Sequence, residues 1–534
     1  MRELARTLHR RVAMIAVAAV ILAGCGAADS GSEPSAGGAQ PSATGAPVGD
    51  GDLDTTSVLH MTSSAPVLNL DPAVQAPGGY PYPALIFDRL MFLDVNDAVI
   101  PGLATKWNFA ADGSYLELTL RDDVTFHDGT PFDADAVKVN IERGQTIEGS
   151  TVKVDLAPIQ SVKVVDKTTV RLMLKKGEGV ALPSSLATAA GMMVSPTAIA
   201  DGVDLKNNPG TAGSGPYVAT EFVPNEKLVV KRADSYWDPA VGRVAGIELL
   251  RVPDAATRLK GVQTGDTDLT FVSSANELTQ AKQLADSGAL QVQGYQFRNV
   301  LGVMLRGDQG DLAKPEVRQA IAHSIDPQAI SALFSGMCTP TRSPYPTDSP
   351  WAASGAYPYE YDLEKAKQLI QSVGGATVPI AFGSGTNTEQ PANVIQSALS
   401  GAGIKANLTP LPNSEVEPRF IAGDFPLEVT NTFNPRIDPA STVDNYLLGT
   451  YRLAVDPSLV DKAAAAAADP TRTTDQRAAD YQGIWTTMLE QAWFIPLCNL
   501  SVDAVAGKNV VGIDNVPWAN VGLWDLRNVA LKKN

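Results

Sequence analysis

Polar and apolar residues alternate along several short segments in the first half of the chain, and this pattern predicts β-strands. Residues 115–120 alternate directly after a turn signal at 111–113, as a half-buried strand does. Residues 162–165 and 170–174 are two further apolar runs, and the four polar residues between them predict a hairpin. Residues 228–230 predict another short strand, so the first half is expected to be rich in strands.

Apolar residues recur at helical spacing in the second half of the chain. One predicted helix presents a single apolar face, formed by Val317, Ala320, Ile321 and Ile325. Asp326 and Pro327 follow this helix. An aspartate cap followed by a proline in the first turn favours a second helix, which we expect to reach Phe334.

Two further helices and a strand continue this pattern. Asp362 stands at the cap position of an apolar stripe over residues 363–373, and Gly374 supplies the C-terminal stop. Another helix is expected over residues 393–399, with a strand at 404–408 behind it. Strands that alternate with helices indicate an α/β fold for the second half.

The N-terminal residues have the pattern of an export signal. Four arginines precede an apolar run of eleven residues, from Val12 to Leu22, which is too short to span a membrane. We therefore expect residues 1–24 to be a signal peptide. The segment from Leu22 to Cys25 resembles a bacterial lipoprotein box, in which the cysteine thiol is lipidated. This predicts a protein anchored to the outer face of the cytoplasmic membrane by Cys25, with a soluble exported protein as the alternative.

The composition separates a tether from an acidic globular body. Residues 26–50 are mostly Gly, Ala, Ser and Pro without an aromatic side chain, so residues 25–51 are expected to form a disordered tether. The formal net charge is −16, and the first 24 residues contribute +3, so a chain that begins at Cys25 carries −19. Such an acidic protein is not expected to bind nucleic acid or anionic lipid directly. Its length predicts two or three domains.

Signatures of catalysis are absent from the sequence. Apart from His9 in the signal peptide, the chain has three histidines, His60, His127 and His323, and it contains no His-Glu-x-x-His, Cys-x-x-Cys, Gly-x-Ser-x-Gly or P-loop motif. His127 and Asp128 are adjacent, but they precede a Gly-Thr-Pro turn. We therefore assign neither a catalytic pair nor a cofactor or metal site, and we expect no enzyme.

A long motif gives the sequence its clearest resemblance. Residues 101–107 and 120–137 together look like the signature of the peptide/nickel-type (family 5) substrate-binding proteins of ABC transporters. Further similar segments follow in the same order as in that family, at residues 213–217, 235–237, 265–269, 317–326 and 361–367. The resemblance covers roughly residues 55 to 530.

This resemblance implies a two-lobed α/β periplasmic-binding-protein fold of type II, of the large cluster-C kind with an inserted subdomain. Lobe one is then expected to comprise residues 52–96, 204–283 and 500–534, with the inserted subdomain at 97–203, and lobe two to comprise residues 284–499. The implied function is that of a monomeric receptor that encloses a solute between its lobes. It delivers the solute to an ABC permease and its ATPase subunits.

Most motif residues are expected to specify the fold. Phe126 and Phe132 should fill the core around the intervening turn, and Asp133 is placed to cap the helix that begins at Ala134. The Gly215-Pro216 pair sets a bend before a strand. These residues therefore predict the architecture and say little about the ligand.

Cys338 and Cys498 are the cysteines that remain once Cys25 is lipidated. An even pair in an oxidising compartment makes a disulfide plausible, and the lobe boundaries above place both in lobe two. Two buried free thiols are the alternative.

The expected ligand contacts lie on two loops. Tyr80 and Tyr82 stand in a Gly- and Pro-rich segment that faces the cleft in the resembling family. Packing of both tyrosines on the surface of lobe one is the alternative. The second loop supplies Phe433 as an aromatic wall, Asn434 as a hydrogen-bonding group and Arg436 as a partner for an anion.

The second loop departs from the pattern of peptide binders. Three residues before its Asp-Pro, those proteins have an aspartate that pairs with the ligand's α-amino group, and this chain has Pro435 there. Asp438 is instead expected to shape the loop, and Arg436 either pairs with it, points to solvent or binds the ligand. A peptide stays the first expectation, followed by a carboxylated non-peptide solute or a chelated metal. A lipoprotein hydrolase with paired carboxylates is the alternative from another class.

Overall fold

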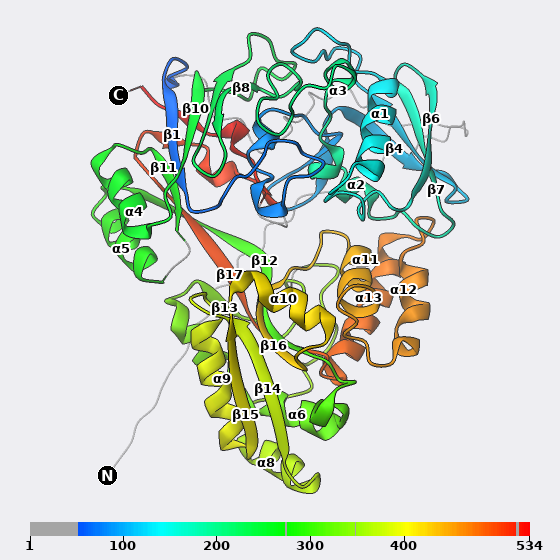
Figure 1. Ribbon diagram of the computed structural model, residues 1–534, viewed down its shortest axis with the longest axis vertical. Coiled ribbons are helices and arrows are strands. Elements are labelled where there is room, and N and C mark those ends of the chain that lie inside the picture. The colour runs from blue at the N-terminus through cyan, green and yellow to red at the C-terminus, as the bar shows by residue number, and fades with distance from the viewer. Residues whose placement is uncertain (1–51, 273–274, 348, 520–522, 534) are drawn as a thin grey trace, which may run out of the picture. The chain divides into compact units, whose positions relative to one another are not determined.

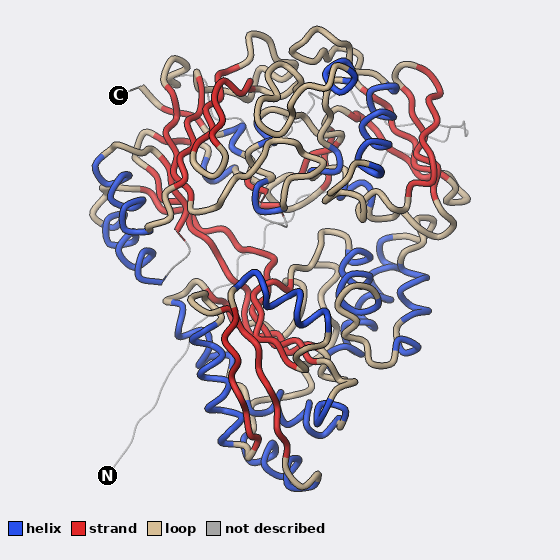
Figure 2. Tube along the Cα trace, viewed as in Figure 1, coloured by secondary structure: helices blue, strands red, loops and turns tan. Residues whose placement is uncertain are grey.

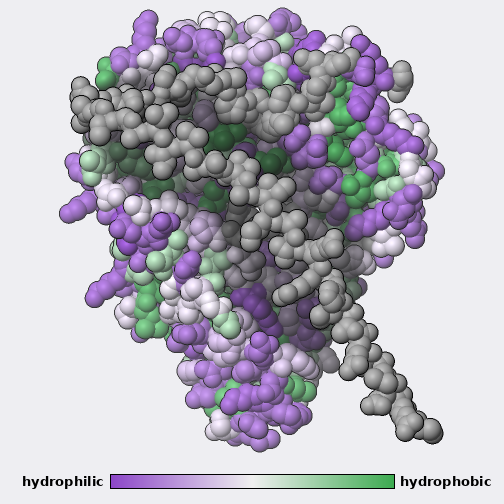
Figure 3. Space-filling model, turned by 180° about the vertical axis from the view of Figure 1, so that it is seen from behind, coloured by the Kyte–Doolittle hydropathy of each residue, from purple (hydrophilic) through white to green (hydrophobic). Residues whose placement is uncertain are grey.

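The computed structural model describes residues 52–272, 275–347, 349–519 and 523–533. The predicted signal peptide, the lipidation site at Cys25 and the tether lie outside the described residues. In the described part of the chain, no helix is both long and apolar enough to cross a membrane. Hydrophilic residues predominate on the lower part of the face seen in Figure 3.

Eleven strands form one large sheet in the order β15-β14-β16-β12-β17-β11-β1-β10-β9-β8, and β13 pairs with β17 off this path. The strands are β1 (Val58–Ser63), β8 (Tyr217–Val223), β9 (Lys227–Arg232), β10 (Gly246–Arg251), β11 (Leu269–Val272), β12 (Gln291–Leu305), β13 (Cys338–Pro340), β14 (Ala376–Gly383), β15 (Ile404–Leu411), β16 (Leu427–Phe433) and β17 (Phe494–Ala506). β1 is parallel to β10 and β11, and β14 is parallel to β15 and β16. Two groups with parallel strands therefore flank the antiparallel pair β12 and β17.

The strands β12 and β17 belong to both groups. Residues 291–296 pair with residues 501–506 next to β11, and residues 300–304 pair with residues 494–499 next to β16. The register shifts between Gln296 and Val300. Figures 1 and 2 show this pair of strands passing from the surroundings of β1 and β11 to those of β14 and β16. The chain therefore crosses twice between the two groups, as the two-lobed fold requires.

Helices pack on both groups of strands. α4 (Ala255–Thr264) contacts β11 and α5 (Ala275–Asp286), whereas α9 (Glu389–Gly401) packs on β14 and β15. α10 (Asn413–Ala422) contacts β14 and β16. The chain after residue 314 also forms α6 (Pro315–Ser324), α7 (Pro327–Ser331), α8 (Leu363–Ser372), α11 (Pro439–Thr442), α12 (Asp461–Ala467) and α13 (Thr474–Glu490).

A separate four-stranded sheet lies between β1 and β8 in the sequence. Its order is β4-β5-β7-β6, from β4 (Ala104–Phe109), β5 (Tyr115–Leu120), β6 (Ile159–Asp166) and β7 (Thr169–Leu174), and α1 (Ala134–Thr146) contacts β6 and β7. The predicted strand at 115–120 and the predicted hairpin are both confirmed. The short elements α2 (Leu182–Ser185), α3 (Pro196–Ala200) and the pairs β2 (Met91–Leu93) with β3 (Val99–Pro101), β18 (Val510–Val511) with β21 (Ala530–Leu531) and β19 (Trp518–Ala519) with β20 (Leu523–Trp524) complete the fold.

The predicted helix caps are confirmed. Asp133 accepts hydrogen bonds from the backbone N–H groups of Asp135 and Ala136 at the start of α1. Asp326 caps α7 and Asp362 caps α8 in the same way. These aspartates satisfy backbone donors that have no partner inside a first helical turn.

The signature motif is part of the core. Phe126 and Phe132 are 1% and 3% exposed, with ring centroids 6.2 Å apart. A side chain at Gly215 would place its Cβ 2.7 Å from the Ile86 carbonyl carbon, so this close approach requires glycine.

The His127 Nε2 lies 2.9 Å from the Gly215 carbonyl oxygen, while the Asp128 carboxylate accepts from the Ser195 hydroxyl at 2.5 Å. His127 and Asp128 thus bond to different partners, which gives both a structural role.

The two remaining cysteines lie side by side on neighbouring strands. Cys338 is on β13 and Cys498 on β17, and their Cα atoms are 5.3 Å apart. Both are buried, at 1% and 0% exposure. This separation suits a disulfide bond, so the spatial condition for the predicted pair is met.

Candidate ligand-binding site

Asp438 fixes the loop that follows β16. Its Oδ1 accepts a hydrogen bond from the Ala440 N–H at 3.0 Å and so caps α11. Both carboxylate oxygens also accept from Arg477 Nη2 at 2.7 Å. The expectation that Asp438 shapes the loop is therefore confirmed, and its ion pair is with Arg477 on α13 instead of Arg436.

Two hydrogen bonds fix the backbone of Arg436, one at its N–H and one at its carbonyl oxygen. Its N–H donates to the Thr442 hydroxyl at 2.7 Å, and its carbonyl oxygen accepts from the Tyr345 hydroxyl at 2.8 Å. Across the described residues, its guanidinium forms no ion pair and no hydrogen bond. The half-buried side chain is thus positioned by a fixed backbone and keeps its donors for another partner.

Asp155 is the acidic residue next to Arg436, and it comes from the loop between α1 and β6. Burial raises the pKa of the Asp155 carboxyl, and the positive charge of Arg436 offsets part of this rise. The two residues form no ion pair with each other. Arg436 and Asp155 therefore lie close enough for the guanidinium to act on the carboxyl, but not within ion-pair distance of each other. Because no motif surrounds Asp155, its position could not be predicted from the sequence.

Tyr80 lies near both of these charges. Burial raises the pKa of its hydroxyl, the negative charge of Asp155 adds to the rise, and Arg436 lowers the pKa. The hydroxyl is 3.5 Å from that of Thr151, which is held by the Gln75 carbonyl at 2.8 Å. The Tyr80 ring is only 4% exposed. Tyr80 is thus close enough to Asp155 and Arg436 for both side chains to act on the pKa of its hydroxyl.

Tyr82 and Phe433 are packed inside the protein. Tyr82 is 3% exposed, and its ring meets Trp524 edge to face at a centroid distance of 5.8 Å. Phe433 is 0% exposed and stacks on Phe494 at 4.0 Å. In this conformation neither ring has surface to offer a ligand. Their packing role is clear, and their role as ligand contacts stays a prediction.

Asn434 has a buried acceptor without a donor. Its backbone N–H donates to the Tyr446 hydroxyl at 2.8 Å, and this hydroxyl donates to the Thr432 carbonyl at 2.8 Å. Within the described part of the chain, the side-chain Oδ1 is buried and has no hydrogen-bond partner. An unpartnered buried acceptor is costly, so the Asn434 Oδ1 could accept an N–H or O–H group of a ligand in a conformation that exposes it.

A second arginine was missed by sequence reasoning. Arg251 ends β10, the strand parallel to β1, and its positive charge lowers the pKa of the buried Tyr82 hydroxyl, which burial raises. Its Nε is buried and has no hydrogen-bond partner among the residues described. Ligands of open α/β sheets bind outside the carboxyl ends of parallel strands, which is where Arg251 lies.

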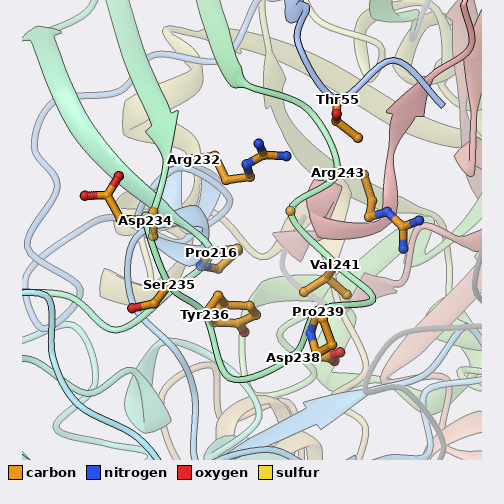
Figure 4. Close-up of a pocket in the computed structure, with 12 residues that line it drawn as sticks. Thr55, Pro216, Arg232, Asp234, Ser235, Tyr236, Asp238, Pro239, Val241 and Arg243 are labelled. Carbon is orange, nitrogen blue, oxygen red and sulfur yellow. The ribbon is translucent and has the colours of Figure 1, made fainter. Parts of the chain in front are cut away.

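A cavity of about 630 Å³ lies elsewhere, beside the end of β9 and the segment that leads to β10 (Figure 4). Arg232 and Arg243 border it, with Tyr236 and Asp238 toward the bottom of the view. Tyr236 already donates to Asp88 at 2.8 Å. The lining includes none of the five residues predicted as ligand contacts, so we place the candidate site at Arg436 and not in this cavity.

Glu428 is a buried acidic residue on β16, the strand that precedes the loop with Arg436. Glu428 is 2% exposed, and in the described part of the chain its Oε2 has no hydrogen-bond partner. Burial raises the pKa of Glu428 from its ordinary value of 4.5 to about 8, and the nearby Glu417 adds to the rise, although a hydrogen bond with Thr430 opposes it. The Glu428 carboxyl of the folded protein therefore stays protonated at neutral pH.

This proton makes stability depend on pH. The unfolded chain releases it near pH 4.5 and the folded protein near pH 8, so folding stability should fall as the pH rises between these values. Glu428→Gln should remove this dependence. The unfolding free energy of the variant minus that of the wild type should therefore be more positive at pH 8 than at pH 5, by on the order of 2–4 kcal/mol. Urea unfolding at both pH values measures this difference. The exposed Glu364→Gln is the control, and an equal Glu428→Gln difference at both pH values would contradict the assignment.

The arrangement defines a class of protein. Two groups of strands share the crossing pair β12 and β17, and polar side chains from separate loops lie near this crossing's second group. Among the residues that the structure describes, no three His, Cys, Asp or Glu side chains cluster as a metal site. This is the architecture of a two-lobed protein that binds a solute.

Comparison with known proteins identifies the family. The sequence model of the bacterial extracellular solute-binding proteins, family 5 (middle part), matches residues 98–452. The chain therefore belongs to family 5 of the bacterial extracellular solute-binding proteins. This family is one of binding proteins, which agrees with the expectation that the chain is not an enzyme.

Two relatives bind different solutes. The nickel-binding periplasmic protein of Escherichia coli K12 is 24% identical over 483 residues, which cover 85% of this chain and 90% of that protein. The glutathione-binding protein of Pectobacterium atrosepticum is 28% identical over 330 residues, or 60% of this chain and 63% of that protein. The family relationship thus leaves the ligand open.

Solved structures confirm the two-lobed fold. The binding protein AgaA from Agrobacterium tumefaciens R10, in complex with agropinic acid, superimposes with a TM-score of 0.75 at 24% identity, covering 90% of this chain and 99% of that one. DppA from Helicobacter pylori, in complex with the peptide STSA, gives a TM-score of 0.73 at 21% identity with 90% and 99% coverage. At these identities the likeness concerns the fold alone.

Proposed function

We propose that this protein is an extracytoplasmic receptor of an ABC importer that captures a small zwitterionic solute, a peptide or a peptide-like acid. The observation that supports this proposal is that the Arg436 guanidinium has no ion pair or hydrogen bond among the described residues, while its positive charge acts on the Asp155 carboxyl and the Tyr80 hydroxyl. A guanidinium binds a carboxylate through two parallel hydrogen bonds. A half-buried carboxylate in turn suits an ammonium group, which is strongly disfavoured in a site without one.

Asp155 supplies what the second loop lacks. Pro435 stands where a peptide binder is expected to have its aspartate, and Asp155 is the acidic group that the structure brings near the same loop. In this proposal Asp155 binds the ligand's ammonium group and Arg436 binds the ligand's carboxylate. The Asn434 side chain accepts a hydrogen bond from the ligand's backbone. This restores the peptide interpretation by a different residue from the one the family resemblance implies.

A carboxylated non-peptide solute is the second candidate. The specific observation in its favour is Arg251, a further cation whose buried Nε has no hydrogen-bond partner in the described part of the chain, and the similarly folded AgaA is in complex with agropinic acid. A chelated metal requires an anionic chelator for the same arginines. The hydrolase alternative loses its support, because the family is one of binding proteins.

Capture is proposed to occur by closure of two lobes about β12 and β17. Lobe one comprises residues 52–96, 204–283 and 500–534 with the subdomain at 97–203, and lobe two comprises residues 284–499. Asp155 and Arg436 then belong to different lobes, so a ligand that contacts both stabilises the closed state. The closed receptor would deliver its solute to the permease and its ATPase subunits.

A thermal-shift screen of the mature protein tests this function. A dipeptide or tripeptide, its N-acetylated and C-amidated forms, agropinic acid and nickel chelates are compared at equal ionic strength. Ligands that bind the folded state raise the melting temperature, and the shift grows with the logarithm of the free ligand concentration relative to Kd. The proposal requires that a solute with both charges raises it most. A protein stabilised by none of these solutes, but active on a chromogenic ester or glycoside, would refute the receptor function.

Arg436→Gln and Asp155→Asn form a matched pair of variants. Arg436→Gln should weaken ligands with a free carboxylate about 10- to 100-fold and leave C-amidated ligands unchanged. Asp155→Asn should weaken only ligands with a free ammonium group and leave N-acetylated ligands unchanged. Isothermal titration calorimetry measures both, and Arg232→Gln, which removes an equal charge from the other cavity, is the control. Equal losses for blocked and unblocked ligands would contradict the assigned contacts.

Anchoring by a lipid on Cys25 completes the proposal. Cys25→Ser should release the exported protein from the membrane fraction into the medium or periplasm and abolish incorporation of radiolabelled palmitate. A variant that stays in the membrane fraction and takes up label would show that Cys25 is not the anchor.

A further inference from the structure

Two turns that are far apart in the sequence meet outside the candidate ligand-binding site. Gly113 lies in the turn between β4 and β5 and has a φ of +70°. A Cβ added to Gly113 would lie 3.3 Å from Cγ of Pro470 and 3.4 Å from Cγ2 of Thr471. Pro470 and Thr471 belong to the turn between α12 and α13. The turn at residues 110–114 and the turn at 469–472 therefore meet with no room for a side chain at residue 113.

Burial at the tip of the β4–β5 turn supports this contact. Ala111 and Asp112 are exposed, but the next residue, Gly113, is buried. The three atoms nearest to an added Cβ at Gly113 all belong to Pro470 and Thr471. The turn at 469–472 thus covers Gly113 at an otherwise exposed tip.

Each turn is fixed by its own hydrogen bonds. The Asp112 Oδ1 accepts from the N–H of Ser114 at 3.0 Å and from its hydroxyl at 2.6 Å. The Asp469 Oδ1 accepts from the N–H and the hydroxyl of Thr471 in the same way, at 2.9 and 2.8 Å. Such aspartate turns form locally, and Pro470 restricts the backbone of the second one further. Two surfaces that are already ordered lose little conformational entropy when they meet.

We propose that these two turns form a latch, which holds the two lobes closed when no ligand is bound. This inference rests on the proposed division into lobes, which assigns Gly113 to the subdomain of lobe one and Pro470 to lobe two. The few van der Waals contacts of the latch are individually weak, so it opens readily and lets a solute enter. A receptor that is already partly closed binds every ligand more tightly, by the same factor.

Disulfide trapping without ligand tests whether the two turns meet in solution. In the mature protein, Gly113→Cys/Thr471→Cys should cross-link under mild oxidation at least about tenfold faster than Gly177→Cys/Thr471→Cys. Gly177 is the matched control, because it lies in the same subdomain and has a φ of +76°. A Cβ added there would meet no described residue within 4 Å beyond its chain neighbours. Mass spectrometry of the linked peptides excludes bonds to Cys338 or Cys498, and equal rates for the two pairs would overturn the proposal.

Small-angle X-ray scattering without ligand tests whether the contact holds the lobes closed. Asparagine tolerates a positive φ better than most residues, but at residue 113 its side chain has no room beside Pro470. Gly113→Asn should therefore increase the radius of gyration, whereas Gly177→Asn should leave it at the wild-type value. If Gly113→Asn does not fold, Pro470→Ala/Thr471→Ser should give the same increase, because it removes the contacting carbons and keeps a hydroxyl for Asp469. An unchanged radius in the folded latch variant would overturn the proposal.

These two measurements need no ligand, so failure of the latch and failure of the receptor function are distinguishable. With a solute found by the thermal-shift screen, Gly113→Asn should weaken binding by the same factor whether the charged groups of the solute are free or blocked. Arg436→Gln should instead weaken only solutes with a free carboxylate. A loss in Gly113→Asn that is confined to unblocked solutes would contradict a latch outside the ligand-binding site.

Discussion

Replacing Arg527 with methionine should lower the free energy of unfolding of this protein by about 3–5 kcal/mol. Arg527 is 1% exposed, its Nε donates to both carboxylate oxygens of Asp525 at 3.0 Å, and its Nη1 donates to Asp88 at 3.2 Å. Methionine keeps much of the apolar packing and removes the charge. Two buried carboxylates are then left with Arg89 as the one arginine of this network, and an uncompensated buried charge is strongly destabilising.

The network around Arg527 joins three segments that are far apart in the sequence. Asp88 also accepts hydrogen bonds from the Tyr236 hydroxyl and the Trp237 indole N–H, both at 2.8 Å. Arg89 forms a buried ion pair with Asp525. The C-terminal segment is thereby tied to the loop that also carries Tyr80. The same network explains the Tyr236-Trp237 pair in the segment 235–237 that resembles the family. Both side chains donate hydrogen bonds to Asp88.

Urea unfolding followed by tryptophan fluorescence measures this loss. Arg419→Met is the matched control, because Arg419 forms an ion pair with Asp424 in which the two side chains are 41% and 46% exposed. Exposed pairs contribute at most about 1 kcal/mol, since water and salt screen them. A similar loss for both variants would contradict the view that burial of the Arg527 network sets its contribution.

The sequence predicted the elements whose signals are local. The strand at 115–120 follows from alternation, and the caps Asp133 and Asp362 follow from one side chain placed before an apolar stripe. The helix expected from Asn393 begins at Glu389 instead. Pro391 lies in its first turn, where the missing N–H needs no partner, so the proline does not delay the start of the helix.

The candidate site was less predictable, because its geometry depends on packing between distant segments. The sequence identified Arg436 and the loop-shaping role of Asp438, both of which lie in a recognisable loop. It gave no sign of Asp155, since a lone aspartate between α1 and β6 acquires its role only from the burial and the Arg436 charge that the fold provides. It also could not show that Tyr82 is turned toward Trp524.

We propose that Cys338 and Cys498 form a disulfide, and its removal should have the other large effect. The bond closes a loop between residues 160 positions apart, which in the loop-entropy model restricts the unfolded chain by about 5 kcal/mol. The Cys338→Ala/Cys498→Ala variant should therefore lose up to about 5 kcal/mol of unfolding free energy. Urea unfolding with and without dithiothreitol measures it, because reductant should bring the wild type to the level of the variant and leave the variant unchanged.

The position of this bond predicts that ligand affinity survives its loss. It joins β13 to β17 at Cys498, beside the residues of β17 that pair with β12 next to β16. Both cysteines therefore brace one group of strands and leave the crossing of β12 and β17 free to bend. The double alanine variant should bind the same solute within about twofold by calorimetry at a temperature where it is folded. A wild type indifferent to reductant would show that the thiols are free, and a large loss of affinity would show that the bond also fixes the crossing.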